Sequence, residues 1–304
     1  MFWLRSNLTL AIEHLTACAG CENAILDLGN SLLSVLRDVE LVYAPILMDA
    51  PPPERVDVAI LTGAIRTEED LEKVKRWRGK CSILVAFGSC ACFGGIPGLA
   101  NLLNSMELLK TSYLEQLGTI NPEGEPPRVE VPALTDFIKP LSRVVKVDYA
   151  LPGCPPPMKL ISKFFEALIS GEEFELPAKS VCDECPLNSG GEKVIKGIRR
   201  WVYDEVDLSK CLLEQGFICL GPATRGGCGA RCIKAGYPCR GCMGVLEGVE
   251  DQAAKMISAI ASATSLEEVS LEDLMRLSDL AGVLYRFTLP ASIFGRKVRG
   301  ARRG

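Results

Sequence analysis

Short apolar runs alternate with amphipathic stretches over about the first 170 residues. Runs typical of strands in a parallel sheet occupy residues 7–12, 40–44, 56–62, 81–87 and 143–147. Helices are predicted at residues 21–36 and 158–170, where apolar positions recur with helical spacing, and at the charged stretch 68–77. This alternation of strands and helices predicts an α/β fold with a doubly wound parallel sheet.

The pattern changes after residue 180. Eight cysteines fall between Cys182 and Cys242, among many glycines and few long apolar runs. Such a composition builds only a small core, so a bound metal has to contribute folding energy. We therefore expect two domains, residues 1–175 and residues 176–304. The second ends in a helical pattern and a basic tail, and residues 101–140 of the first are expected to be an insertion of helix and loop.

Composition narrows the function classes. The chain has 304 residues, 14 cysteines, a single histidine and a net charge of −4. Mild acidity argues against nucleic-acid binding, and one histidine argues against histidine-dependent catalysis. No apolar stretch reaches the roughly 18 residues that a membrane span needs, and the N-terminus lacks a signal-peptide pattern. We expect a cytoplasmic protein, where clustered cysteines are more often metal ligands than disulfides.

Four cysteines of the first domain lie directly after predicted strands. Cys18 and Cys21 follow the first strand, Cys90 follows the strand at 81–87, and Cys154 follows the strand at 143–147. The carboxyl ends of parallel strands meet at one edge of a sheet, so these four thiols are expected to converge. Four thiolates suit either a 4Fe–4S cluster or a tetrahedral zinc ion.

The second domain supplies enough thiols for two further four-cysteine sites. Its eight cysteines are Cys182, Cys185, Cys211, Cys219, Cys228, Cys232, Cys239 and Cys242. The spacing of these cysteines does not distinguish zinc sites from iron–sulfur sites. It also does not show which four cysteines belong to which site. Cys81, at the start of a buried run, is expected to be a core residue. Cys92 lies two residues after Cys90 and is an alternative ligand to it.

Three motifs in the first domain carry a family resemblance. They are Cys-x-Gly-Cys at residues 18–21, Gly-Ser-Cys-x-x-x-Gly-Gly at 88–95 and Pro-Gly-Cys-Pro-Pro at 152–156. Together they resemble nickel–iron hydrogenase small subunits. Residues 218–224, 238–242 and 250–262 are similar to the branch of archaeal methyl-viologen-reducing hydrogenases that do not reduce deazaflavin.

This resemblance implies a flavodoxin-like domain followed by a small ferredoxin-like iron–sulfur domain, with three 4Fe–4S clusters in all. The proximal cluster would be held by Cys18, Cys21, Cys90 and Cys154, and the medial and distal clusters by the eight later cysteines. It also implies a separate large subunit with the nickel–iron centre, and an iron–sulfur or flavin acceptor of the heterodisulfide reductase type. The alternatives are an iron–sulfur subunit of an oxidoreductase without hydrogenase activity, and a zinc-stabilised interaction protein.

Four charged residues beside these cysteines have two interpretations each. Glu22 follows a proximal ligand and is either a proton relay or an acid at a helix start. His14 is either a donor to a cluster sulfur or an ordinary half-buried histidine. Arg225 and Arg240 either raise a cluster potential or offset the negative charge of thiolate-bound iron. The structural interpretation is favoured for the first two, and charge compensation for the arginines.

Overall fold

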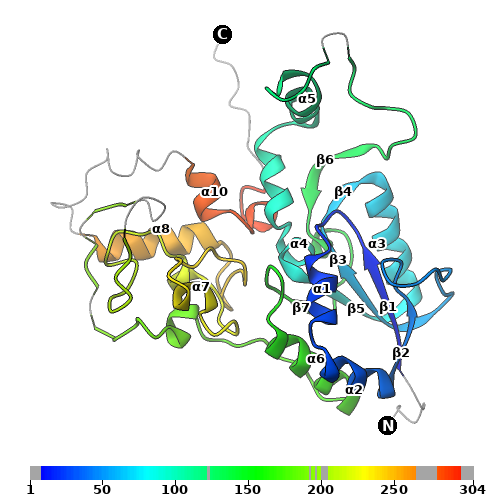
Figure 1. Ribbon diagram of the computed structural model, residues 1–304, viewed down its shortest axis with the longest axis horizontal. Helices are drawn as coiled ribbons and strands as arrows, with labels where there is room; N and C mark the ends of the chain where they lie inside the picture. The colour runs from blue at the N-terminus through cyan, green and yellow to red at the C-terminus, as the bar shows by residue number, and fades with distance from the viewer. Residues whose placement is uncertain are drawn as a thin grey trace.

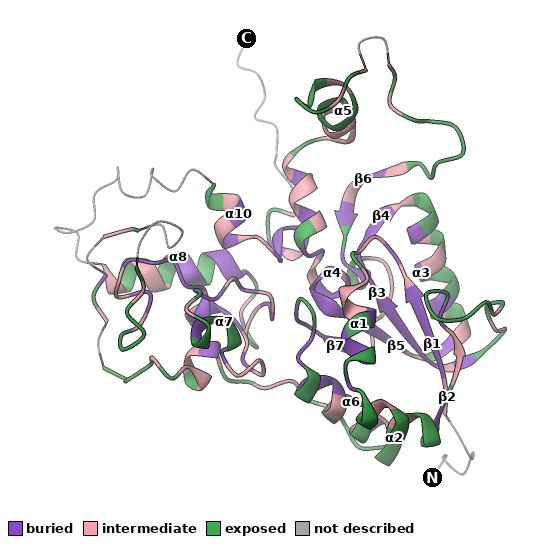
Figure 2. Cartoon of the chain, in the orientation of Figure 1, coloured by how far each residue is buried: buried purple, intermediate pink, exposed green. Residues whose placement is uncertain are grey.

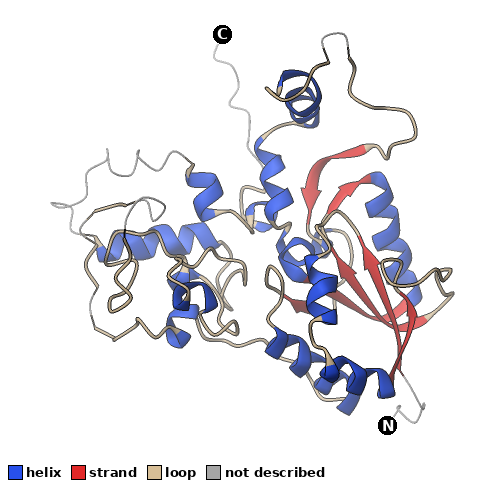
Figure 3. Cartoon of the chain, in the orientation of Figure 1, coloured by secondary structure: helices blue, strands red, loops and turns tan. Residues whose placement is uncertain are grey.

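The computed structural model describes residues 8–121, 124–191, 193–195, 197–199, 205–264 and 279–295. Two lobes are visible in Figure 1: a lobe built around a sheet, and a second lobe with little regular structure, in which loops predominate (Figure 3). Residue 7 of the first predicted strand, residues 122 and 123, and residues 296–304 of the basic tail lie outside the described residues.

A parallel sheet of five strands, in the order β2-β1-β3-β5-β7, forms the centre of the first lobe. Taken in chain order, these strands are arranged 2-1-3-4-5, which is the flavodoxin-like order. The predicted doubly wound parallel sheet is therefore confirmed. The strands are β1 (Leu8–His14), β2 (Val39–Tyr43), β3 (Val56–Thr62), β5 (Cys81–Phe87) and β7 (Tyr149–Leu151).

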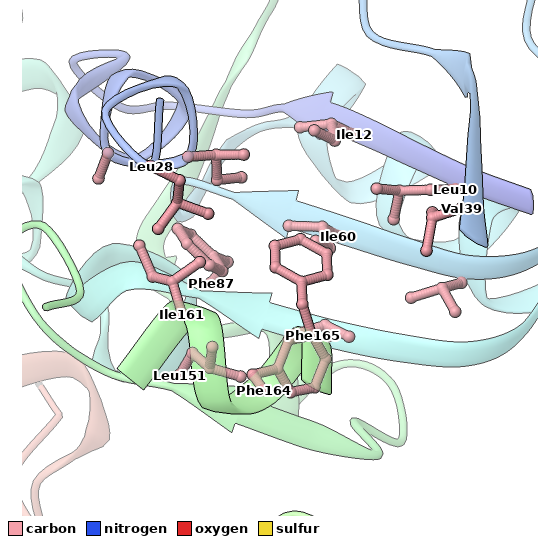
Figure 4. Packing of buried hydrophobic residues seen from close by; sticks show 14 of the residues in the cluster. Leu10, Ile12, Leu28, Val39, Ile60, Phe87, Leu151, Ile161, Phe164 and Phe165 are labelled. Carbon is pink, nitrogen blue, oxygen red and sulfur yellow. The ribbon is translucent and has the colours of Figure 1, made fainter. Parts of the chain in front are cut away.

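Helices cover both faces of this sheet. Residues of α1 (Gly20–Leu26), α2 (Asn30–Asp38) and α6 (Met158–Ser170) pack on one face, where Phe165 lies beside Ile60 (Figure 4). Residues of α3 (Glu68–Lys80) and α4 (Gly88–Phe93) pack on the other face. The strands are buried between these two layers (Figure 2), which explains their continuous apolar sequence.

Three sequence-based expectations for this lobe need correction. The helix predicted at 21–36 is two helices, because the chain turns at Gly29 with a φ of 55°. The strand predicted at 143–147 is wrong: Val144, Val145 and Val147 pack against the core without pairing, and pairing with β5 begins only at Tyr149. The insertion also contains a strand, β6 (Leu134–Lys139), antiparallel to β4 (Ile65–Thr67), in addition to α5 (Ser105–Lys110).

The second lobe has its own hydrophobic core, in which Leu212, Phe217 and Met256 pack together with Cys219 and Cys239. Within the described residues of this lobe, the α-helices are α7 (Arg231–Lys234), α8 (Gln252–Ala263) and α10 (Leu280–Leu284).

The last described segment returns to the first lobe. The N–H of Gly95 donates to the carbonyl of Phe287 at 3.1 Å, and the Asn101 amide donates to the carbonyl of Gly295 at 2.9 Å. Pro290 lies so close to Gly94 and Gly98 that a Cβ on either glycine would be 2.3 or 2.4 Å from its ring. This segment thus joins the two lobes, and the division at residue 175 stays a prediction.

Candidate metal centres

The first thiol group consists of Cys18, Cys21, Cys90 and Cys154, which lie in the loops and helix starts that follow β1, β5 and β7. The Ser89 N–H donates to the Gly153 carbonyl at 2.8 Å and ties the β5 loop to the β7 loop. Each of Cys21, Cys90 and Cys154 is subject to electrostatic repulsion from at least one other cysteine of the group. The structure therefore brings these four residues together, and their role as ligands of one cluster stays a prediction.

Two glycines make room for the sulfur atoms. A Cβ on Gly88 would lie 2.3 Å from Cys21 Sγ, and a Cβ on Gly95 would lie 2.4 Å from Cys90 Sγ. Both glycines also have positive φ, 87° and 59°, which disfavours a side chain at either position. The loops are thus shaped around sulfur.

The second thiol group consists of Cys182, Cys185, Cys211 and Cys219. All four line one cavity of about 330 Å³, together with Asn188 and Lys193. Gly221 lies between two of the sulfurs: its Cβ would be 3.0 Å from Cys182 Sγ and 3.7 Å from Cys219 Sγ.

We define the third thiol group as the four cysteines of the second lobe that do not line this cavity, Cys228, Cys232, Cys239 and Cys242. Burial raises the pKa of the Cys242 thiol to about 12; repulsion from Cys228 and Cys232 adds to this rise, and the backbone N–H of Cys154 opposes it. Burial also raises the pKa of Cys232, again with repulsion from Cys228. These interactions place Cys228, Cys232 and Cys242 in one neighbourhood.

Two cysteines link the three groups into a row. Cys242 interacts with Cys154 of the first group, and the Ser89 hydroxyl donates to the Cys242 carbonyl at 2.6 Å. Cys239 interacts with both Cys242 and Cys219, and its N–H donates to Cys219 Sγ at 3.2 Å. The third group therefore lies between the first and the second, although it comes last in the sequence.

Crowded thiols of this kind fit a cationic metal core. Burial raises the pKa of Cys90 and Cys182 to about 12 and that of Cys219 to about 11, and repulsion from neighbouring cysteines contributes to each rise. Thiolates at such positions are stable only with compensating positive charge. In the part of the chain that the structure describes, no three His, Cys, Asp or Glu side chains converge closely enough for a single metal ion.

The remaining two cysteines, Cys81 and Cys92, belong to none of the three thiol groups. Cys81 is buried at the start of β5, as expected of a core residue. Cys92 is buried among the residues that pack on the α3 side of the sheet, and its thiol donates to the Ala86 carbonyl at 3.3 Å. The alternative of Cys92 as a ligand in place of Cys90 is therefore disfavoured by the structure.

The charged residues singled out in the sequence are engaged as follows. The Glu22 carboxylate is buried and bonds to the Thr62 hydroxyl and to His14 Nδ1, the latter at 2.8 Å. The Arg225 guanidinium donates to the carbonyls of Pro177 and Val245 at 2.9 and 3.2 Å and so fastens two loops. Arg240 is near Cys219, Cys232 and Cys239.

Two further residues of the site have no motif in the sequence. Glu184 accepts hydrogen bonds from the N–H groups of Gly227 and Gly229, on either side of Cys228, at 2.6 and 2.8 Å. Lys193 lines the cavity of the second thiol group, and its ammonium nitrogen is buried. In the sequence, the position of Glu184 between Cys182 and Cys185 is the one signal that it belongs to the site. The sequence has no such signal for Lys193.

Comparison with known proteins identifies the family. The family model "NADH ubiquinone oxidoreductase, 20 Kd subunit" matches residues 18–168. A subunit of the vhu F420-non-reducing hydrogenase of Methanocaldococcus jannaschii is 42% identical over 298 residues, covering 96% of this chain and 100% of that protein. The iron-sulfur subunit of the F420-non-reducing hydrogenase of Archaeoglobus profundus is 34% identical and covers 96% of this chain and 99% of its own length.

A solved structure agrees with these relatives. A chain of the NAD+-reducing [NiFe]-hydrogenase in its H2-reduced state has a TM-score of 0.54 and 31% identity, covering 56% of this chain and 96% of that one. None of the helices that the structure describes is both long enough and apolar enough to cross a membrane. On this sequence similarity the chain belongs to the family of iron–sulfur subunits of F420-non-reducing hydrogenases, oxidoreductases that work as complexes.

Proposed function

We propose that this chain conducts electrons between the nickel–iron large subunit of a cytoplasmic hydrogenase and an acceptor of the heterodisulfide reductase type, using three 4Fe–4S clusters. The observation that carries the proposal is the row of three four-thiol groups, first, third and second, held in contact by Cys242 and Cys239. A continuous row is what electron transfer across a subunit needs, whereas a structural metal site needs no neighbour.

We assign four of the twelve cysteines to each of three clusters. Cys18, Cys21, Cys90 and Cys154 would hold the proximal cluster, Cys228, Cys232, Cys239 and Cys242 the medial one, and Cys182, Cys185, Cys211 and Cys219 the distal one. Clusters of this type supply one-electron redox chemistry when bound. The protein's part is to bury them, to direct N–H groups at sulfur and to place charges nearby. Residues 1–175 and 176–304 would be the two cluster-binding domains.

The first thiol group is open on one side, which suits a docking site. Cys18 and Cys154 are exposed, although a buried cluster site would be expected to cover them. Exposed apolar side chains lie on the neighbouring α1 and on the loop after β2, namely Leu26, Ile46 and Leu47. Exposed apolar side chains grouped in this way are a mark of a protein interface. We infer that the large subunit covers this face, and that the acceptor meets the second lobe.

Anaerobic purification of the chain with its co-purifying subunits tests this function. We expect about 12 iron and 12 acid-labile sulfide per chain, since three 4Fe–4S clusters hold that number. Hydrogen-dependent reduction of viologen without reduction of deazaflavin is expected of the complex. Full iron content without nickel or hydrogen oxidation would indicate an electron-transfer subunit of another oxidoreductase. Zinc with negligible sulfide would exclude electron transfer.

A further inference from the structure

Lys193 lies in an unusual position at the second thiol group. It lines the cavity of about 330 Å³ that Cys182, Cys185, Cys211 and Cys219 also line. Its ammonium nitrogen is buried and has no hydrogen-bond partner within the described residues. Two other polar residues line the cavity, Ser180 and Asn188, and neither side chain carries a charge. The Asn188 amide donates to the Cys182 carbonyl at 2.9 Å.

A buried ammonium group without a partner is costly, because it loses its hydration and gains nothing in return. The cost disappears when an anion occupies the cavity beside it. Four thiolates around a cluster form such an anion, and the positive charge of Lys193 already acts to lower the pKa of Cys182 against the effect of burial. The orphaned charge and the four thiols thus complement each other.

The first thiol group has the opposite surroundings. The charged residue that acts on both Cys21 and Cys90 is the buried Glu22, whose negative charge adds to the repulsion between the thiols. A negative charge beside a redox group opposes the arrival of an electron, whereas a positive charge favours it. The two ends of the row therefore differ in electrostatic character.

Resting on the function proposed above, we propose that Lys193 is the counter-cation of the cluster at the second thiol group and raises its reduction potential. Reduction of this cluster adds one electron, and hence one negative charge, which the ammonium group stabilises. Removal of the charge destabilises the reduced form more than the oxidised form. An electron is accordingly held more firmly at the outer end of the row, from which an acceptor would take it.

Replacement of Lys193 in the intact anaerobic complex tests this role. Lys193→Met removes the charge with little change in length, and Lys193→Arg keeps it. Lys210→Met is the matched control, since Lys210 precedes Cys211 but has a side chain that is 70% exposed. The reduction potential of each cluster is measured by titration with electron paramagnetic resonance, and the signal of the second group is assigned by its loss in Cys182→Ser.

We expect Lys193→Met to lower the potential of that signal alone. The expected size is a fall of about tenfold in the reduced-to-oxidised ratio at fixed potential, equivalent to 59 mV for one electron. Lys193→Arg and Lys210→Met should keep the wild-type value. An unchanged potential in fully loaded Lys193→Met would overturn the proposal.

If Lys193→Met fails to bind the cluster at the second thiol group, its iron content is measured instead of the potential. Loss of about four iron in Lys193→Met, restored in Lys193→Arg, would support the need for a cation; loss in both variants would contradict it. Absence of cluster signals from the wild-type complex would instead refute the proposed function.

Discussion

Replacing Glu184 by glutamine tests how one thiol group holds another in place. The carboxylate of Glu184 belongs to the turn that carries Cys182 and Cys185, and it accepts the N–H groups of Gly227 and Gly229 at 2.6 and 2.8 Å. Glutamine offers a single acceptor oxygen, so its amide nitrogen would face one of these donors. One charge-assisted hydrogen bond is then lost, and a half-buried N–H is left without a partner.

The expected cost follows from the hydrogen bond that is removed. A bond to a charged group contributes about 1.5–3 kcal/mol. Because about 1.4 kcal/mol corresponds to a factor of ten, local opening of the loop should become roughly 10 to 100 times more frequent. The loop that opens is the one that carries Cys228, so the third thiol group should loosen while the first stays unchanged.

Amide hydrogen exchange of the anaerobic protein measures this opening. We expect the amide of Gly227 or Gly229 to exchange about 10 to 100 times faster in Glu184→Gln. Glu173→Gln, at an exposed position after α6, is the control and should leave both amides unchanged. Wild-type exchange at both glycines in Glu184→Gln would refute the role given to this carboxylate.

Three further predictions concern the first lobe. Cys90→Ser should remove the first cluster, and with it about four of 12 iron. Cys92→Ser should retain this iron, because the Cys92 thiol donates to the Ala86 carbonyl. Equal iron loss in the two variants would show that both thiols are needed. Gly88→Ala should also lose the first cluster, because the new Cβ would be 2.3 Å from Cys21 Sγ. Gly171→Ala is the control: Gly171 has a similar positive φ, but no atom lies within 4 Å of its Cβ, so this variant should lose no iron. Thr67→Ala removes the N-cap of α3 and should cost about 1 kcal/mol, seen as a fall of about 2–4 °C in melting temperature; an unchanged value would contradict the importance of the cap.

Sequence and structure agree closely in two strands that are buried on both faces. The strand over Val56–Thr62 and the strand over Cys81–Phe87 have the predicted bounds, because continuous apolar sequence leaves few other places for them. The strand at 143–147 was misplaced because its valines are as apolar as a strand but pack beside the sheet instead of pairing with it. The break in the first helix had a local signal, Gly29, since its positive φ favours glycine.

The cysteines show what the sequence by itself determined. Their placement after successive parallel strands was enough to predict the first thiol group, because the carboxyl ends of such strands share one edge of the sheet. The eight later cysteines lie in a region with little regular structure, so no periodicity relates one to another. Only tertiary packing placed the last four of them between the other two groups and brought Lys193 and Glu184 to their loops. Electrostatic environment depends on distances between residues far apart in the chain, and the folded structure alone sets those distances.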